Sequence, residues 1–354
     1  GACDILFDNV SSLQGWGSIA FNVVQGVNVI NSNVNRFDVH YHGYNIYVDN
    51  CRLSEFGITM GCGGGDLIVT NCNRNIGSLN DFYQYASSNP LVYMLSVIYF
   101  RGDYGNYFDG NIVVDGVKME LSRDNVFSTA TESAPGVLSV VSFNAGKARG
   151  SSVEDSYADY GYTAPVPWGN SITVKNVTLH LHNAAQRASW VSLVGVNYGK
   201  RWVAPSVLPA PVITVENLNF DHAPSMAKIE PIVFTDMVHS TSLVKSNNKR
   251  VNFNLNAQIR DVHSGWANGR AIMIGTIGSC TLDLMYSQTE VSSFPENSVV
   301  PHIVLDNVTG IAARASIPCQ VDVDGGLLLG MSDSSEGRNQ DCWITFRGTK
   351  IFCL

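Results

Sequence analysis

Polar side chains with catalytic potential alternate along one short stretch of the chain. In residues 36–42, Arg-Phe-Asp-Val-His-Tyr-His, strand alternation predicts that Phe37, Val39 and Tyr41 share one face. The opposite face then carries a guanidinium, a carboxylate and two imidazoles. These groups belong to Arg36, Asp38, His40 and His42.

A second stretch, residues 99–103, places Tyr99, Arg101 and Asp103 together by the same alternation. Glycoside hydrolysis needs a carboxylic acid and a carboxylate, about 5–5.5 Å apart for retention and about 6.5–9.5 Å apart for inversion. Stacked strands offer both separations, because neighbouring strands lie about 4.8 Å apart and alternate residues about 6.7 Å apart. Asp38 and Asp103 are therefore the predicted acid pair, near the inverting distance, with His40 as a third catalytic residue.

Other residues are predicted to bind substrate through charge, hydrogen bonds or stacking. The imidazoles suit contacts with sugars better than metal ligation, because no third ligand stands at a suitable spacing. The sequence predicts neither a metal nor a cofactor. The predicted substrate-binding residues are Arg36, His42, Tyr99, Arg101, Glu55, Asp109 and Trp168.

Two other functions fit the same residues. A polysaccharide lyase needs a base and a cation that neutralises a uronate carboxylate. His40 or Tyr99 would be the base, and Arg36 or Arg101 would supply the cation. A non-catalytic adhesin would instead hold a glycan on aromatic side chains such as Trp168.

A purely structural explanation of these polar groups also stays open. Asp38 would then pair with Arg36 or His40 as part of a polar ladder on the sheet. Asp103 would pair with Arg101 in the same way, and exposed ion pairs of this kind contribute little to stability.

The elements that must position these groups follow a repeated phrase, apolar-x-apolar-x-Asn-apolar. Its Asn stands first at positions 9, 31, 50 and 71, so the intervals are 22, 19 and 21 residues. The alternating apolar residues are typical of a strand against a core. Asn suits the corner that follows, because it adopts left-handed backbone and bonds local groups. Copies stacked in register are expected to hydrogen-bond through these Asn side chains.

This repeat predicts an all-β fold of stacked parallel coils, a β-solenoid, because one coil needs about this many residues. Longer intervals after residue 71 predict coils with loop insertions, where binding and catalysis commonly reside. The order weakens from about residue 312. The predicted division is a solenoid body at 1–311 and a C-terminal capping and association segment at 312–354.

Composition excludes several other classes of protein. The 354 residues are 45% hydrophobic and only 15% charged, whereas soluble domains average about 25% charged. A net charge of −8 without a basic cluster argues against nucleic-acid binding. No apolar run approaches the roughly 18 residues of a membrane span. Cys51 and Cys72 occupy equivalent points of the repeat and are predicted to be buried thiols rather than a disulfide.

The phrase NVNRFDVHYHGYNIYVDNCRL at 33–53, the following GITMGCGGGDLIVTNC and the Asn-ended strands from 5 to 308 resemble the tailspike depolymerases of tailed phages. Those proteins, within the wider pectate-lyase-like group, have a right-handed single-stranded parallel β-helix. The resemblance implies a homotrimer that needs no metal and cleaves a bacterial capsular or O-antigen polysaccharide for host recognition. The resulting expectation is an endo-glycosidase.

The resemblance also implies a place for the protein. It would belong to the phage virion and act extracellularly at the host cell surface. An N-terminal part would join it to other tail or baseplate proteins, and that part is expected to be missing here because the sequence starts at Gly1 without an initiator Met.

Overall fold

The architecture comes from a computed structural model of the chain. The residues that it describes are 1–13, 18–76, 96–100, 107–121, 136–144, 170–181, 188–197, 212–222, 228–235, 256–262, 273–274, 302–306, 309–311, 314–315, 320–324, 327–329, 343–347 and 350–352.

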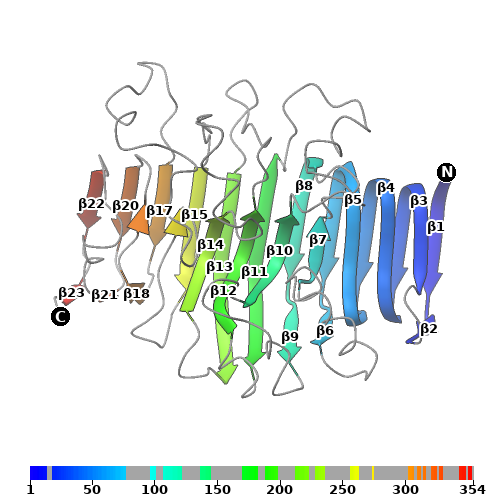
Figure 1. Cartoon of the computed structure of the whole chain (residues 1–354), viewed down its shortest axis with the longest axis horizontal. Helices are drawn as coiled ribbons and strands as arrows, with labels where there is room; N and C mark the ends of the chain where they lie inside the picture. Colours follow the sequence, from blue (N-terminus) through cyan, green and yellow to red (C-terminus); the bar gives the residue numbers. More distant parts are fainter. Residues whose placement is uncertain are drawn as a thin grey trace, which may run out of the picture.

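Every regular element in these ranges is a β-strand (Figure 1). The first eleven are β1 (Ala2–Asp8), β2 (Ser11–Ser12), β3 (Ile19–Ile30), β4 (Asn33–Asp49), β5 (Arg52–Thr70), β6 (Asn73–Ile76), β7 (Ile98–Phe100), β8 (Tyr107–Asp115), β9 (Lys118–Leu121), β10 (Gly136–Asn144) and β11 (Ser171–Leu181). The others are β12 (Ala188–Asn197), β13 (Val212–His222), β14 (Lys228–Thr235), β15 (Asn256–Val262), β16 (Met273–Ile274), β17 (His302–Asp306), β18 (Thr309–Ile311), β19 (Arg314–Ala315), β20 (Gln320–Asp324), β21 (Leu327–Leu329), β22 (Trp343–Arg347) and β23 (Lys350–Phe352).

Successive copies of the repeated phrase pair in parallel and in register. β3 pairs with β4, β4 with β5, β5 with β8 and β8 with β11, so that equivalent apolar positions lie side by side. The first apolar position of the phrase forms one buried row of side chains. Its members are Val27, Ile46, Leu67, Ile112, Ile172 and Ile213. Alternation along each strand thus builds the hydrophobic core, as the sequence predicts.

The way in which the sheet closes differs from the prediction. The chain is all-β, but the main sheet closes into a seven-stranded parallel β-barrel around one axis, with further strands outside it. The expected right-handed single-stranded parallel β-helix with loop insertions is therefore wrong, and so is that part of the resemblance. The repeat specifies which residues pair between neighbouring copies. Closure depends on strand twist and stagger and on strands contributed by distant segments, which the repeat does not encode.

Strands of the predicted capping segment also join these sheets. β20 pairs with β17 and β22 pairs with β20 in the main sheet, while β18, β21 and β23 form a separate three-stranded sheet. In Figure 1 β1 and β22 lie at opposite ends of the long axis of the molecule. The division at residue 312 and the capping role remain predictions.

The corner after each phrase is built as the sequence predicts. The repeat Asn residues take a left-handed backbone with φ between 50° and 56°, and Gly116 replaces Asn in one copy with φ 68°. Asn50 Nδ2 donates to Asn31 Oδ1 at 2.9 Å, and Asn217 Nδ2 donates to Asn176 Oδ1 at 2.7 Å. In other copies the amide donates to an Asp of the preceding copy, as Asn71 does to Asp49. The predicted Asn ladder is confirmed with this variation.

The prediction of buried free thiols is confirmed for Cys51 and Cys72. Cys51 and Cys72 are buried free thiols on adjacent copies. The backbone N–H of Cys51 donates to Cys72 Sγ at 3.4 Å, and Cys51 Sγ donates to the Asp49 carbonyl at 3.2 Å. The hydrogen bond with Cys51, together with burial, raises the pKa of Cys72. This thiol is consequently protonated and inert at neutral pH.

Candidate functional site

The candidate site lies on β4, where the strand contains one extra residue. Between Val39 and His42, β4 advances by three residues while β3 and β5 each advance by two. The bulge therefore contains His40 and Tyr41. Bulges redirect side chains and are common beside active sites. Here the bulge turns Tyr41 outward to 37% exposure, whereas alternation alone predicts that it shares the core face of Phe37 and Val39.

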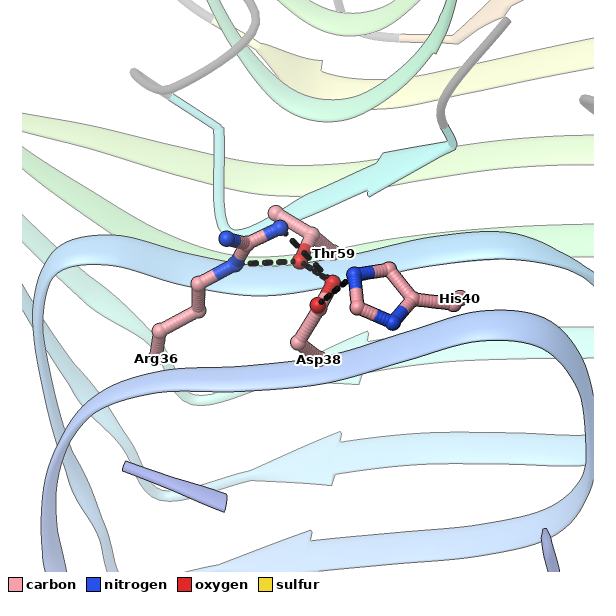
Figure 2. A network of polar contacts seen from close by, with 4 residues as sticks. All are labelled: Arg36, Asp38, His40 and Thr59. Atoms are coloured by element: carbon pink, nitrogen blue, oxygen red, sulfur yellow. Dashed lines mark hydrogen bonds and ion pairs between the residues drawn. The ribbon is translucent and has the colours of Figure 1, made fainter. Parts of the chain in front are cut away.

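Asp38 is the centre of the polar network in Figure 2. Its Oδ1 lies 2.7 Å from Arg36 Nη2 and also accepts a hydrogen bond from the Thr59 hydroxyl. Thr59 Oγ1 in turn accepts a hydrogen bond of 2.8 Å from Arg36 Nε. The guanidinium thus binds the carboxylate directly and through Thr59, which restrains all three side chains.

His40 is the member of the network that reaches the surface. Its Nε2 lies 2.9 Å from Asp38 Oδ2, and its side chain is 34% exposed, against 3% for Asp38. When Nε2 donates to Asp38 in the neutral ring, Nδ1 is the nitrogen with the lone pair. The arrangement has the form of a base oriented by a buried carboxylate.

The predicted polar wall is correct in its members and wrong in its exposure. Arg36 and Asp38 are each only 2% exposed, although they lie on the face opposite to the core residues Phe37 and Val39. This region of the sheet is therefore buried on both faces, as parallel sheets commonly are. The pairing of Asp38 with Arg36 and His40 that the structural explanation expects is present, but it is buried and not on an exposed ladder.

Access to His40 is from the side of β3. Asp38 pairs with Ala20 on β3, and Ala20 is exposed. Asn22 and Val23, further along β3, are exposed as well.

His42 lies beyond the bulge, beside Tyr44. The two rings are nearly parallel, at 5°, with centroids 6.4 Å apart. Burial lowers the pKa of His42 below its ordinary value, which favours the neutral imidazole. Its predicted role in binding substrate remains a prediction.

Of the other predicted site residues that the structure describes, Tyr99 lies in register with the polar network and Asp109 does not. Tyr99 on β7 is buried at 6% exposure and pairs with Thr59, while Asp109 on β8 is exposed. Glu55 belongs to β5, but its side chain lies outside the described part of the structure. The residues that fall outside the described ranges are Arg101, Asp103 and Trp168. The Asp38–Asp103 separation therefore remains untested.

Thr59 is the member of the network that the sequence analysis missed. Hydroxyl groups are common on strands, and nothing in its local sequence marks it. The repeat holds the signal, because Thr59 and Asp38 each stand twelve residues before the Asn of their own copy. Equal spacing places them side by side on β5 and β4, where they pair.

Among the described residues, no group of three or more His, Cys, Asp or Glu side chains is arranged to hold a metal ion. The same residues contain no helix with the length and apolar character needed to cross a membrane. Comparison of the chain with protein-family models, with curated proteins and with solved structures found no match. The geometry of the site is accordingly the basis for inferring its chemistry.

Proposed function

We propose that this chain cleaves a bacterial surface polysaccharide, with His40 as the general base and Asp38 as the residue that orients it. The observation that carries the proposal is the 2.9 Å contact between a half-exposed imidazole and a buried carboxylate. A histidine held in this way has a fixed tautomer and direction, which a general base requires. Asp38 also stabilises the positive charge that the ring gains with the proton.

This geometry supports β-elimination better than hydrolysis by Asp38. A glycosidase acid or nucleophile must touch the glycosidic bond, but Asp38 is 3% exposed and is held by Arg36, Thr59 and His40. In β-elimination His40 takes the proton from the carbon next to a uronate carboxylate. The electron pair forms a carbon–carbon double bond, the bond from the ring to the glycosidic oxygen breaks, and the leaving oxygen takes a proton from a solvent water.

Arg36 has a different role in this proposal from the one expected for it. Its guanidinium is bound to Asp38 and Thr59 and is 2% exposed. It therefore supports the site by holding the carboxylate that orients His40. The cation that neutralises the uronate carboxylate is then Arg101, the other arginine predicted for this role, which lies outside the described residues. The expected homotrimer, the attachment to phage tail proteins and the action at the host surface are kept as parts of the proposal and rest on the sequence resemblance.

The test is incubation of the purified chain with a panel of capsular and O-antigen polysaccharides. New reducing ends and the ultraviolet absorbance of an unsaturated uronate are followed together. The proposal predicts that both signals rise and that His40→Asn lowers the rate by about 10²–10⁴-fold. His180→Asn is the matched control, because His180 is also partly buried but lies on β11.

Three results would contradict the proposal. Reducing ends without unsaturation would indicate hydrolysis and return attention to the carboxylates. Equal rates for His40→Asn and the wild type would exclude His40 as the base. Retention of a polysaccharide without either signal would indicate a glycan-binding protein that is not an enzyme.

A further inference from the structure

A row of side chains beside His40 crosses four strands on the outer face of the sheet. Tyr44 on β4 pairs with Gln25 on β3 and with Gly64 on β5, and Gly64 pairs with Asp109 on β8. Residues that pair in this way point to the same face. Gln25 and Asp109 are exposed, and Tyr44 is 38% exposed. We call these four residues the Tyr44 row.

Glycine makes room for the tyrosine ring in this row. A Cβ atom on Gly64 would lie 3.2 Å from Cε1 of Tyr44 and 2.5 Å from the carbonyl oxygen of Asp109. The second distance is shorter than real Cβ atoms allow. Without a side chain at position 64, the Tyr44 ring lies close over the backbone of β5, and its edge approaches Asp109.

The side chains next to Tyr44 on the side of His42 are uncharged. The His42 ring is stacked nearly parallel to the Tyr44 ring, with centroids 6.4 Å apart, and the lowered pKa of His42 keeps it neutral at neutral pH. Val23, opposite His42 on β3, is 42% exposed. Tyr44 thus stands between the amide of Gln25 and the carboxylate of Asp109, with His42 and Val23 beside it.

We propose that the Tyr44 row is a subsite for a neutral pyranose ring of the polysaccharide. The C–H face of such a ring packs on an aromatic side chain, while its hydroxyls hydrogen-bond to polar groups around the edge. Gln25 offers a donor and an acceptor about 4.8 Å from Tyr44, and Asp109 offers acceptors about 9.6 Å away on the other side, measured between backbones. The carboxylate of Asp109 repels a uronate and so selects against an acidic sugar.

The position of the Tyr44 row also indicates which sugars the polysaccharide contains. The inference rests on the proposed function for its ligand, a polysaccharide, and for the cleaved bond at His40. Tyr44 stands four residues beyond His40 on β4, and because the bulge takes up one of these residues, the separation along the strand is about 10 Å. A sugar on Tyr44 would consequently flank the cleaved bond and not contain it. The predicted substrate is a heteropolymer that alternates uronate and neutral sugars.

The experiment is saturation-transfer-difference NMR on the full chain at neutral pH. The probes are the methyl pyranosides of glucose, galactose and mannose, with methyl glucuronide as the acidic counterpart. At least one neutral probe should receive saturation on the C–H protons of one ring face. Tyr44→Ala should weaken binding about tenfold or more, whereas Tyr44→Phe should retain it because the ring is kept.

Tyr47→Ala and Asp109→Asn test whether the effect is specific to Tyr44 and whether the Asp109 carboxylate repels an acidic sugar. Tyr47→Ala is the matched control on the same strand, past the corner at Asn45, and should bind like the wild type. Asp109→Asn should increase binding of methyl glucuronide. Loss of binding in Tyr47→Ala equal to that in Tyr44→Ala, no saturation of any neutral probe, or a preference for the glucuronide that Asp109→Asn leaves unchanged would each overturn the inference.

Binding of the neutral probes is measured independently of polysaccharide cleavage, so it tests the subsite separately from the proposed function. His40→Asn should bind the neutral probes normally. If no polysaccharide is cleaved but Tyr44-dependent binding is observed, the proposed enzyme fails and the subsite stands. If cleavage depends on His40 but Tyr44→Ala binds the probes normally, the subsite fails and the enzyme stands.

Discussion

His40 Nε2 contacts Asp38 Oδ2 at 2.9 Å, and the two residues are two positions apart on one strand. The base and its orienting group therefore do not depend on a contact between distant segments. The support for Asp38, in contrast, is partly non-local, because Thr59 comes from the next strand. We therefore expect substitutions at Asp38 and at Thr59 to change catalysis and stability by different relative amounts.

Asp38→Asn should lower stability strongly. The substitution keeps the size of the side chain but leaves the buried guanidinium of Arg36 without its counter-charge. Removing one partner of a buried ion pair costs about 3–5 kcal/mol, which urea unfolding would measure. Asp109→Asn, at an exposed position, should leave the unfolding midpoint unchanged. A loss below about 1 kcal/mol for Asp38→Asn would show that the buried pair is not needed.

Thr59→Val should reduce both stability and catalysis. Valine has nearly the same shape but provides no partner for Arg36 Nε or for Asp38 Oδ1, and such losses cost about 1–3 kcal/mol. Because Thr59 is 2% exposed and does not reach substrate, kcat should fall while KM stays near the wild-type value. Thr59→Ser, which keeps the hydroxyl, should restore most of the rate. An equal defect in both variants would argue against a role for the hydroxyl.

Asn50→Ala should be more damaging than Asn50→Gly. Both variants lose the hydrogen bond to Asn31 Oδ1, but only alanine is strained at φ 50°. The left-handed backbone costs alanine roughly 1–2 kcal/mol, whereas Gly116 already occupies the equivalent corner of another copy. Thermal unfolding of the two variants gives the difference. Equal stabilities would mean that the side-chain bond, and not the backbone conformation, is what this corner requires.

His42 should make stability depend on pH on the acid side of neutrality. Burial lowers its pKa in the folded chain, so the unfolded chain takes up the proton first as pH falls through about 6.5. Stability associated with His42 is therefore fully present above this pH and is lost below it. Unfolding midpoints between pH 7.5 and 5, read at about half-unit steps, should decline less for His42→Gln than for the wild type. Parallel profiles would show that His42 contributes nothing to the decline.

The sequence by itself predicts the strands, their core face and their corners. Val27 and Ile46 are buried, and Asn31 and Asn50 turn the backbone, because these properties depend on each residue and its near neighbours. The repeat spacing also predicts which copies pair, since equal intervals bring equivalent residues into register. The same reasoning correctly places Arg36, Asp38 and His40 together, because they alternate on one strand.

Only the tertiary structure decides how the sheet closes and which of these groups reaches solvent. Closure into a barrel depends on twist and on pairing between distant strands, which a repeated phrase leaves open. The bulge at His40 exists only relative to β3 and β5, so β4 alone does not reveal that Tyr41 turns outward. Burial on both faces leaves Asp38 inaccessible as the expected acid, because accessibility is set by what packs over a residue and not by its own sequence.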